Sequence, residues 1–431
     1  MTIFILKRNV YRAFLFLKVK IIMEDLTLNT SNKKLKRNIS IGYAYNFFLQ
    51  LNITTAVWVL YLAFKGMSLA EIGILESIYH ITGLLLELPS GAIADLKGRK
   101  FCVVTGRAVS LISCYLMIIS NSFLGFAVSF MLSSAAMNLN SGAAEALIYD
   151  SLKELGEEEK YKKIWGQLVF VMSIAQGIAI LLGGILADIK FLYAYMLGMI
   201  VQTAALLVSL GFSEPKIYNN DINNKQEKLI IKQVKTSIDV LKERKIVLYI
   251  ILFSALMGSL QTTVFFYSQK FFSDMAYTKT LIAVICSLGC LIEAVSSKYA
   301  YIFESRLKLK GTLIILSVVN IIALAGLALF KDLSVFFYLL TSVSGGLAFT
   351  IFSDYINTEI PSEYRATILS FDSLCFSVFM ICIFPMFGLI AEHAGFSATF
   401  GVTAIIYVPV MAFLIKKLIK QNKENKENTS L

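Results

Sequence analysis

Long apolar runs recur along the whole of this 431-residue chain. A helix that crosses a lipid bilayer needs about 20 mostly apolar residues. Twelve runs come near or exceed that length: 40–63, 69–93, 101–119, 124–147, 164–187, 191–212, 246–267, 277–299, 311–329, 333–357, 364–391 and 395–416. Only 16% of the residues are charged, whereas soluble domains carry roughly 25%. The pattern therefore predicts an all-α integral membrane protein with twelve transmembrane helices in a lipid bilayer.

The basic residues are divided unequally between the two sides of these spans. Five of the 40 Lys and Arg lie in connections on one side: Lys65, Lys190, Lys270, Lys279 and Lys331. The other 35 lie on the side that holds both termini. Because basic residues accumulate on the cytoplasmic side of membrane proteins, we expect a multi-pass protein of the cell (plasma) membrane with both termini in the cytoplasm. The same division explains the net charge of +11 without a nucleic-acid partner.

A polar stretch separates the spans into two sets of six. The expected parts are a cytoplasmic N-terminal segment (1–39), an N-terminal six-helix bundle (40–212), a cytoplasmic linker (213–245), a C-terminal six-helix bundle (246–416) and a cytoplasmic tail (417–431). Residues 228–245 of the linker have apolar residues at helical spacing, which predicts an amphipathic helix on the inner membrane surface. The basic, apolar residues 1–22 are either a second interfacial helix or an untranslated stretch that precedes a start at Met23.

The second half of the chain resembles the first at an offset of 204 residues. The segment LGGILAD (182–188) aligns with MFGLIAE (386–392), and Asp150 aligns with Asp354. Several matches at one offset indicate a duplication. Two parallel six-helix halves joined by a polar linker are typical of transporters, in which the substrate site lies near the bilayer midplane between the halves.

The connection between the second and third spans reads GAIADLKGRK, residues 91–100. Gly91 would let the second span approach a neighbour closely, and Gly98 would permit a tight turn. Asp95 adds negative charge on the side where positive charge is favoured. A carboxylate there can accept backbone N–H groups at a helix N-terminus or pair with a guanidinium.

This stretch resembles the cytoplasmic signature of the major facilitator superfamily, G-x-x-x-D-R-x-G-R-R/K. The residues that fit it are Gly91, Asp95, Gly98, Arg99 and Lys100, with Leu96 in place of the usual Arg. The resemblance implies two parallel six-helix bundles that work by alternating access. It also implies that Asp95 and Arg99 join Asp150, at the end of the fourth span, in a charge cluster that latches the halves together on the cytoplasmic side. The alternative is a static helix cap with a salt bridge in the loop.

Ionisable side chains within the apolar runs each cost at least about 2.5 kcal/mol on insertion, so each needs a reason. The candidates for proton coupling or substrate binding are Glu145, Glu87, His80 and Glu293. Glu145 is the first choice, because the superfamily resemblance places spans 1, 4, 7 and 10 around a central cavity. The alternatives are that Glu145 and Glu87 belong to the charge cluster and that Glu293 pairs with Lys298. Glu76 shares a helical face with His80 and is expected to be solvated at the outer interface.

The cavity spans also carry polar side chains: Asn46, Gln50, Asn140, Gln261, Tyr267 and Asp354. An apolar pocket with a few polar groups and aromatic rings suits amphipathic organic molecules. Ordinary interhelical hydrogen bonding is the alternative for each of these residues. We expect no basic residue in the cavity, which argues against phosphate esters and dicarboxylates as substrates.

The sequence therefore predicts a monomeric secondary transporter that exports amphipathic small molecules or drugs against proton entry. The span-5 signature of drug–proton antiporters is only partly present, since its small residues remain and its Pro is missing. Uptake of a nutrient or osmolyte is one alternative, and a membrane receptor without net transport is another. No enzyme is predicted, because no nucleophile–base pattern is found. No cofactor or metal site is expected either, because the six Cys lack the spacing of metal ligands.

Overall fold

The computed structural model describes residues 32–215, 244–360 and 365–429. Within these ranges the chain is helical and contains no strand. The predicted interfacial helix at 1–22 and nearly all of the predicted amphipathic helix at 228–245 lie outside the described residues.

The first half consists of a helix at 32–50 followed by α2 (Trp58–Phe64), α3 (Leu69–Lys97), α4 (Arg99–Ile119), α5 (Phe123–Asn140), α6 (Ala143–Glu154), the short 3-10 helix η1 (Glu158–Lys160), α7 (Tyr161–Ile189) and α8 (Phe191–Leu210). The second half consists of α10 (Lys245–Asp274), α11 (Lys279–Leu329), the 3-10 helix η3 (Lys331–Leu333), α12 (Ser334–Glu359) and α13 (Arg365–Thr429).

Nine segments of the described chain are long and apolar enough to cross a membrane. Two of them, α11 and α13, each contain one non-helical residue, Lys308 and Gly395, that divides the helix into two spans. The first predicted span is formed by the helix at 32–50 together with α2. The described helices therefore account for the twelve predicted spans.

Two of those spans are not continuous helices, contrary to the prediction. The fourth is interrupted between α5 and α6, where Gly142 has a left-handed conformation with φ of 70°. The first is interrupted by a turn at 51–57. Non-helical backbone at membrane depth is tolerated where it is buried against protein. The carbonyl of Ile53 lies against Gly183 of α7, and the carbonyl of Thr55 accepts a hydrogen bond of 3.0 Å from the Gln269 side chain.

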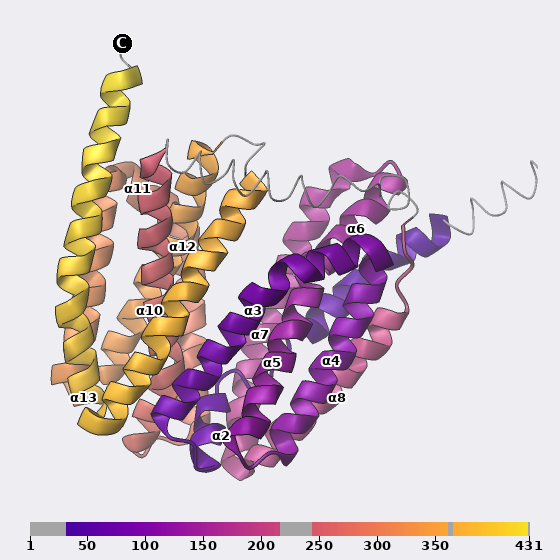
Figure 1. The fold of residues 1–431 in the computed structure, drawn as a ribbon, viewed down its shortest axis with the longest axis horizontal. Coiled ribbons are helices and arrows are strands. Elements are labelled where there is room, and N and C mark those ends of the chain that lie inside the picture. Colours follow the sequence, from indigo (N-terminus) through magenta and orange to yellow (C-terminus); the bar gives the residue numbers. More distant parts are fainter. Residues whose placement is uncertain (1–31, 216–243, 361–364, 430–431) are drawn as a thin grey trace, which may run out of the picture.

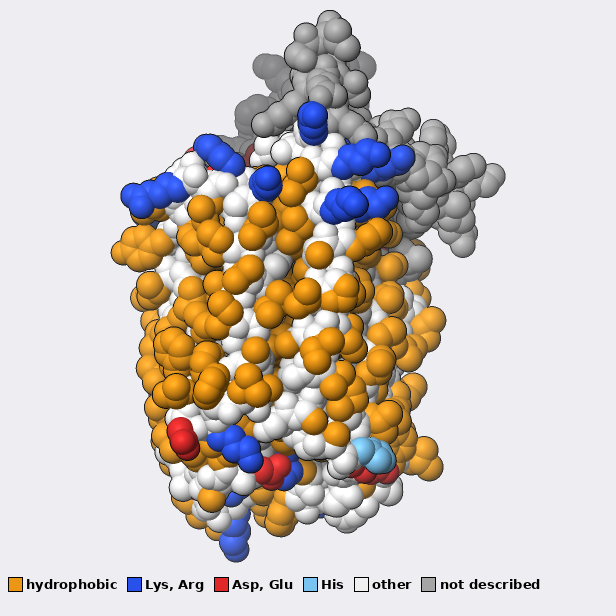
Figure 2. All heavy atoms as spheres, turned by 90° about the vertical axis from the view of Figure 1, so that its left-hand side faces the viewer, with side chains coloured by type: hydrophobic (Ala, Val, Ile, Leu, Met, Phe, Trp, Pro, Cys, Tyr) orange, Lys and Arg blue, Asp and Glu red, His pale blue; other side chains and the backbone are white. Residues whose placement is uncertain are grey.

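The two halves stand side by side and lean apart toward the end where residues 213–215, at the start of the linker, and the C-terminal end of α13 lie (Figure 1). We call this the linker end and the other the opposite end. Figure 2 shows the second half with a broad belt of hydrophobic side chains and with Lys and Arg gathered mainly at the linker end. An apolar belt with charged residues at its two ends is the surface expected of a protein that spans a bilayer.

The halves pack together along two seams, one between α3 and α13 and the other between α7 and α11. On the first seam a Cβ at Gly73 would come within 2.4 Å of the Cα of Pro385. Among the described residues, the hydrogen bonds that join the halves lie between mid-depth and the opposite end. The seams are therefore closed at the opposite end, whereas the halves diverge at the linker end.

Candidate functional site

The connection at 91–100 forms a tight turn with an ion pair. Gly98 has φ of 93° and joins α3 directly to α4, as its predicted role requires. Arg99 Nε lies 2.7 Å from Asp150 Oδ2, so the predicted pairing of these two side chains is present. Both residues belong to the first half. This ion pair therefore does not join the halves in this conformation.

Glu214 completes this site and is not among the residues predicted from the sequence. Its two carboxylate oxygens accept hydrogen bonds of 2.7 Å from the backbone N–H groups of Arg99 and Lys100. Glu214 thereby caps α4, whose first residue follows a glycine that has no side chain to do so. It lies 115 residues after Arg99, so no local pattern connects the two. The sequence feature that could have revealed it is an acidic residue two positions after the sixth apolar run, on the side where basic residues dominate.

Gly91 and Asp95 have no partner among the residues that the structure describes. A Cβ at Gly91 would meet no atom within 4 Å, so the predicted close approach of a neighbouring helix is wrong here. The physical reason is that the halves diverge at this end. Asp95 is half-buried and forms no hydrogen bond or ion pair with the described residues. Its part in a latch between the halves stays a prediction about another conformation.

His80 lies on the seam between α3 and α13, at about the middle of α3. Its Nε2 is 3.6 Å from Glu76 Oε1, and its Nδ1 is 3.3 Å from the Ser377 hydroxyl on α13. Glu76 is only 9% exposed, so the expectation that it is solvated at the outer interface is wrong. The packing of α13 against α3 buries it, and sequence alone does not reveal that contact. The pair thus places two titratable groups at a contact between the halves.

An aromatic cluster also bridges the halves. Trp58, on the short helix after the break in span 1, lies at ring-centroid distances of 5.1 Å from Phe266 and 6.1 Å from Phe384 in the second half. Its third neighbour is Phe130 of α5, at 5.6 Å. Edge-to-face and offset rings of this kind stabilise a contact beyond the area that they bury. Trp58 therefore presents an aromatic surface where four helices of both halves meet.

Most of the predicted cavity residues use their polar groups within the protein. In the first half, Asn46 donates to the Gly42 carbonyl, Asn140 accepts from the Tyr45 hydroxyl, and Gln50 contacts the Met172 sulfur. In the second half, Gln261 donates to the Thr341 carbonyl and the Ser344 hydroxyl. The Tyr267 hydroxyl donates to the carbonyls of Leu69 and Phe384. Tyr267 thereby joins the halves at the opposite end. These contacts match the alternative of structural hydrogen bonding.

The predicted acidic candidates lie in different surroundings. Glu145 is exposed on α6 and accepts a hydrogen bond of 2.5 Å from the Tyr161 hydroxyl. Glu293 and Lys298 form no ion pair in the described part of the chain, contrary to the alternative considered for Glu293. The Lys298 ammonium lies 5.7 Å from the centre of the neighbouring Tyr299 ring. The side chains of Glu87 and Asp354 form no hydrogen bond or ion pair with the described residues.

Two further charged side chains within the spans were not singled out as site candidates. Asp372 on α13 is half-buried and accepts a hydrogen bond of 3.3 Å from Ser254 on α10. The sequence feature that could have identified Asp372 is an acidic residue within the eleventh apolar run. Arg107 is 3% exposed and donates to Gln202 of α8 over 3.2 Å. Its guanidinium therefore lies between helices of the first half.

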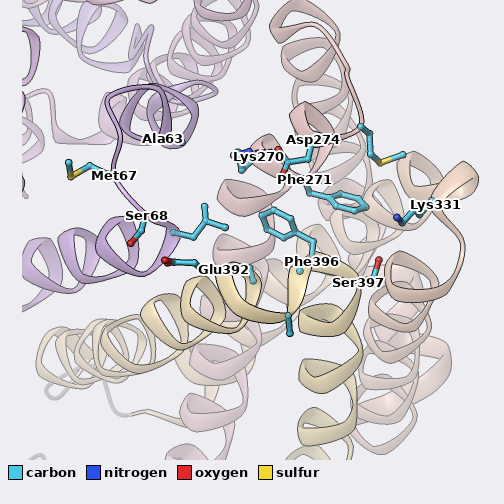
Figure 3. Close-up of a pocket in the computed structure, with 15 residues that line it drawn as sticks. Ala63, Met67, Ser68, Lys270, Phe271, Asp274, Lys331, Glu392, Phe396 and Ser397 are labelled. Atoms are coloured by element: carbon cyan, nitrogen blue, oxygen red, sulfur yellow. Dashed lines mark hydrogen bonds and ion pairs between the residues drawn. The ribbon is translucent and has the colours of Figure 1, made fainter.

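A cavity of about 690 Å³ opens at the opposite end, between the turn that precedes α3 and the second half (Figure 3). Its lining includes Ser68 of the first half and Lys270, Asp274, Glu392 and Phe396 of the second. Lys270 pairs with Asp274 across one turn of α10. In Figure 3 the Glu392 side chain points toward the start of α3. The cavity thus lies where the two halves meet.

The fold and the paired six-helix halves define a membrane transporter. The family model of the Major Facilitator Superfamily matches residues 39–385, and the chain belongs to that superfamily. The uncharacterized MFS-type transporter YxaM of Bacillus subtilis is 23% identical over 393 residues, covering 89% of this chain and 97% of YxaM. An uncharacterized MFS-type transporter of Methanocaldococcus jannaschii is 22% identical and covers 88% and 98% of the two chains.

Solved structures show the same fold at low sequence identity. The nucleoside transporter NupG superimposes with a TM-score of 0.71 at 16% identity, over 90% of this chain and 99% of that one. A D-xylose–proton symporter superimposes with a TM-score of 0.66 at 14% identity, over 88% and 96%. These likenesses confirm the predicted fold class, that of an all-α major facilitator transporter.

Proposed function

We propose that this transporter is a monomer that exports amphipathic organic compounds in exchange for protons. Its preferred substrates in this proposal are amphipathic cations. In this proposal the linker end faces the cytoplasm of a plasma-membrane protein, as the distribution of Lys and Arg favours. The observation that carries the proposal is the Glu76–His80 pair, which lies on the seam between the halves and contacts Ser377 across it.

Proton coupling requires that a proton bind one conformation of the protein more tightly than the other. A carboxylate and an imidazole that are largely buried at a contact between the halves meet this requirement, because the charge on either group is costly inside the membrane unless it has a partner. Opening the seam would hydrate both groups and remove His80 from Ser377. Proton uptake and seam opening are then linked.

The aromatic cluster supports amphipathic substrates. Trp58, Phe130, Phe266 and Phe384 offer ring faces and edges on which an apolar or aromatic compound can pack. A cation would be favoured by the rings and by the Glu76 carboxylate. Where one carboxylate binds either a proton or the cation, inward proton flow drives the cation outward, so a shared site favours exchange. The buried Arg107 guanidinium donates to Gln202 of α8.

The test is flux in proteoliposomes with an imposed pH gradient, using a panel of lipophilic cations, neutral drugs, sugars and amino acids. We expect gradient-driven movement of a lipophilic cation, reduced at least about ten-fold in Glu76→Gln, which is the effect of losing roughly 1.4 kcal/mol of coupling. Glu145→Gln is the matched comparison, because Glu145 is exposed and hydrogen-bonded to Tyr161.

Other outcomes would replace the proposal. Loss of coupling in Glu145→Gln alone would return the proton site to Glu145. Flux of a sugar or an amino acid in the direction of the proton gradient would indicate uptake of a nutrient or osmolyte. Saturable binding without flux of any compound would indicate a receptor.

A further inference from the structure

The acid at the end of span 5 caps the start of span 8, which belongs to the other half. Asp188 lies at the opposite end of α7, and its two carboxylate oxygens accept hydrogen bonds of 2.7 Å each from the backbone N–H groups of Lys279 and Thr280. These are the first two residues of α11. Their N–H groups have no partner within the helix. A negative charge at this position is stabilised by the helix dipole.

The acid at the end of span 11, in the second half, caps the start of span 2 in the first half. Glu392 Oε2 accepts a hydrogen bond of 3.0 Å from the backbone N–H of Ala70, the second residue of α3. Ser68 and Glu71 satisfy other groups at this helix start through a capping box. Each half therefore contributes one carboxylate that caps a helix of the other half. Asp188 and Glu392 are also the pair that the 204-residue repeat aligns.

A glycine four residues before each acid makes the close approach possible. A Cβ at Gly184 would come within 2.7 Å of the Lys279 carbonyl oxygen, and a Cβ at Gly388 within 2.3 Å of the Leu69 carbonyl oxygen. In both cases this carbonyl belongs to the first residue of the capped helix. The glycine and the acid thus form one contact unit, and we call 184–188 and 388–392 the docking units.

A third segment with a glycine and an acid is undocked in the same structure. Gly91 and Asp95 have the same spacing at the linker end of α3. No atom lies within 4 Å of a Cβ placed at Gly91, and Asp95 has no hydrogen-bond or ion-pair partner in the described chain. The two docking units lie at the end where the seams are closed, whereas the undocked segment 91–95 lies where the halves diverge. Docking therefore accompanies closure.

We propose that the two docking units form the gate that holds the opposite end closed, and that Asp188 and Glu392 set how often this end opens. The inference rests on the proposed function, since export in exchange for protons requires the two ends to open in turn. Opening would withdraw both carboxylates from the helix starts and would separate Gly184 from Lys279 and Gly388 from Leu69. The gate depends on backbone N–H groups, because the ammonium of Lys279 lies 3.8 Å from Asp188, too far for a strong ion pair.

The test places a cysteine at Ser77, which is 7% exposed on the closed seam. A membrane-impermeant maleimide is applied to intact cells and to inverted vesicles. The labelling of the parent protein, which lacks the new cysteine, is subtracted as background. We expect Asp188→Asn and Glu392→Gln each to raise labelling from the side of the opposite end roughly five-fold, the size expected of one charge at a helix N-terminus. The double variant should exceed both.

Matched controls separate the gate from a general loss of charge or of packing. Asp332→Asn removes an exposed carboxylate at the same end and should leave labelling unchanged. Gly184→Ala should raise labelling, whereas Gly177→Ala on the same helix should not, because no atom lies within 4 Å of a Cβ there. Wild-type labelling in the double variant, or an equal rise in Asp332→Asn, would overturn the gate. The assay needs no substrate, so a failed flux experiment would leave its result intact.

Discussion

At the scale of single residues, Asp95 lacks its predicted latch contact in this conformation. It is half-buried, and it forms no hydrogen bond or ion pair with the described residues. We expect the Asp95→Asn variant to insert into the membrane and to have the thermal unfolding midpoint of the wild type, because the substitution removes no hydrogen bond or ion pair that the structure describes. Transport should nevertheless fall at least about ten-fold if Asp95 stabilises the alternative state by roughly 1.4 kcal/mol. Wild-type flux in this variant would rule out the latch.

At the scale of elements, the junction between α3 and α4 depends on one glycine. Gly98 has φ of 93°, and a Cβ there would come within 2.9 Å of the Glu214 carboxyl carbon. We expect Gly98→Ala to destabilise the protein by about 1 to 3 kcal/mol, because it combines left-handed backbone strain with displacement of the cap on α4. The measurement is the thermal unfolding midpoint of the purified protein.

Gly91→Ala is the matched control for this element. Gly91 lies within α3 and has open space around it. Because glycine in a helix costs about 0.5 to 1 kcal/mol relative to alanine, this substitution should be neutral or slightly stabilising. Equal unfolding midpoints for the two variants would show that the turn at Gly98 is not under the constraint described.

At the scale of the whole molecule, the distribution of charge predicts the orientation in the membrane. The linker contains several trypsin sites, among them Lys225, Lys228 and Arg244. We expect trypsin to cut the linker in inverted vesicles and to leave it intact in whole cells. Cleavage of the linker from outside whole cells would reverse the orientation and, with it, the assignment of the opposite end to the outer surface.

The sequence by itself determined the spans, the repeat and the turn at Gly98. Membrane insertion depends on the local sum of transfer free energies, so apolar runs can be read without knowing the packing. The pairing of Arg99 with Asp150 was accessible through a family motif. The breaks in spans 1 and 4 were not, because a broken helix at membrane depth depends on neighbours that satisfy its backbone.

Only the tertiary structure decided which polar groups meet. Glu214 caps a helix that begins 115 residues earlier in the chain, and Asp188 caps one that begins 91 residues later. Glu76 is buried because α13 covers it. These contacts arise between helices that are distant in sequence, and some of them exist in only one arrangement of the two halves. A hydropathy pattern records how deep a residue lies, but not which helix faces it or in which state.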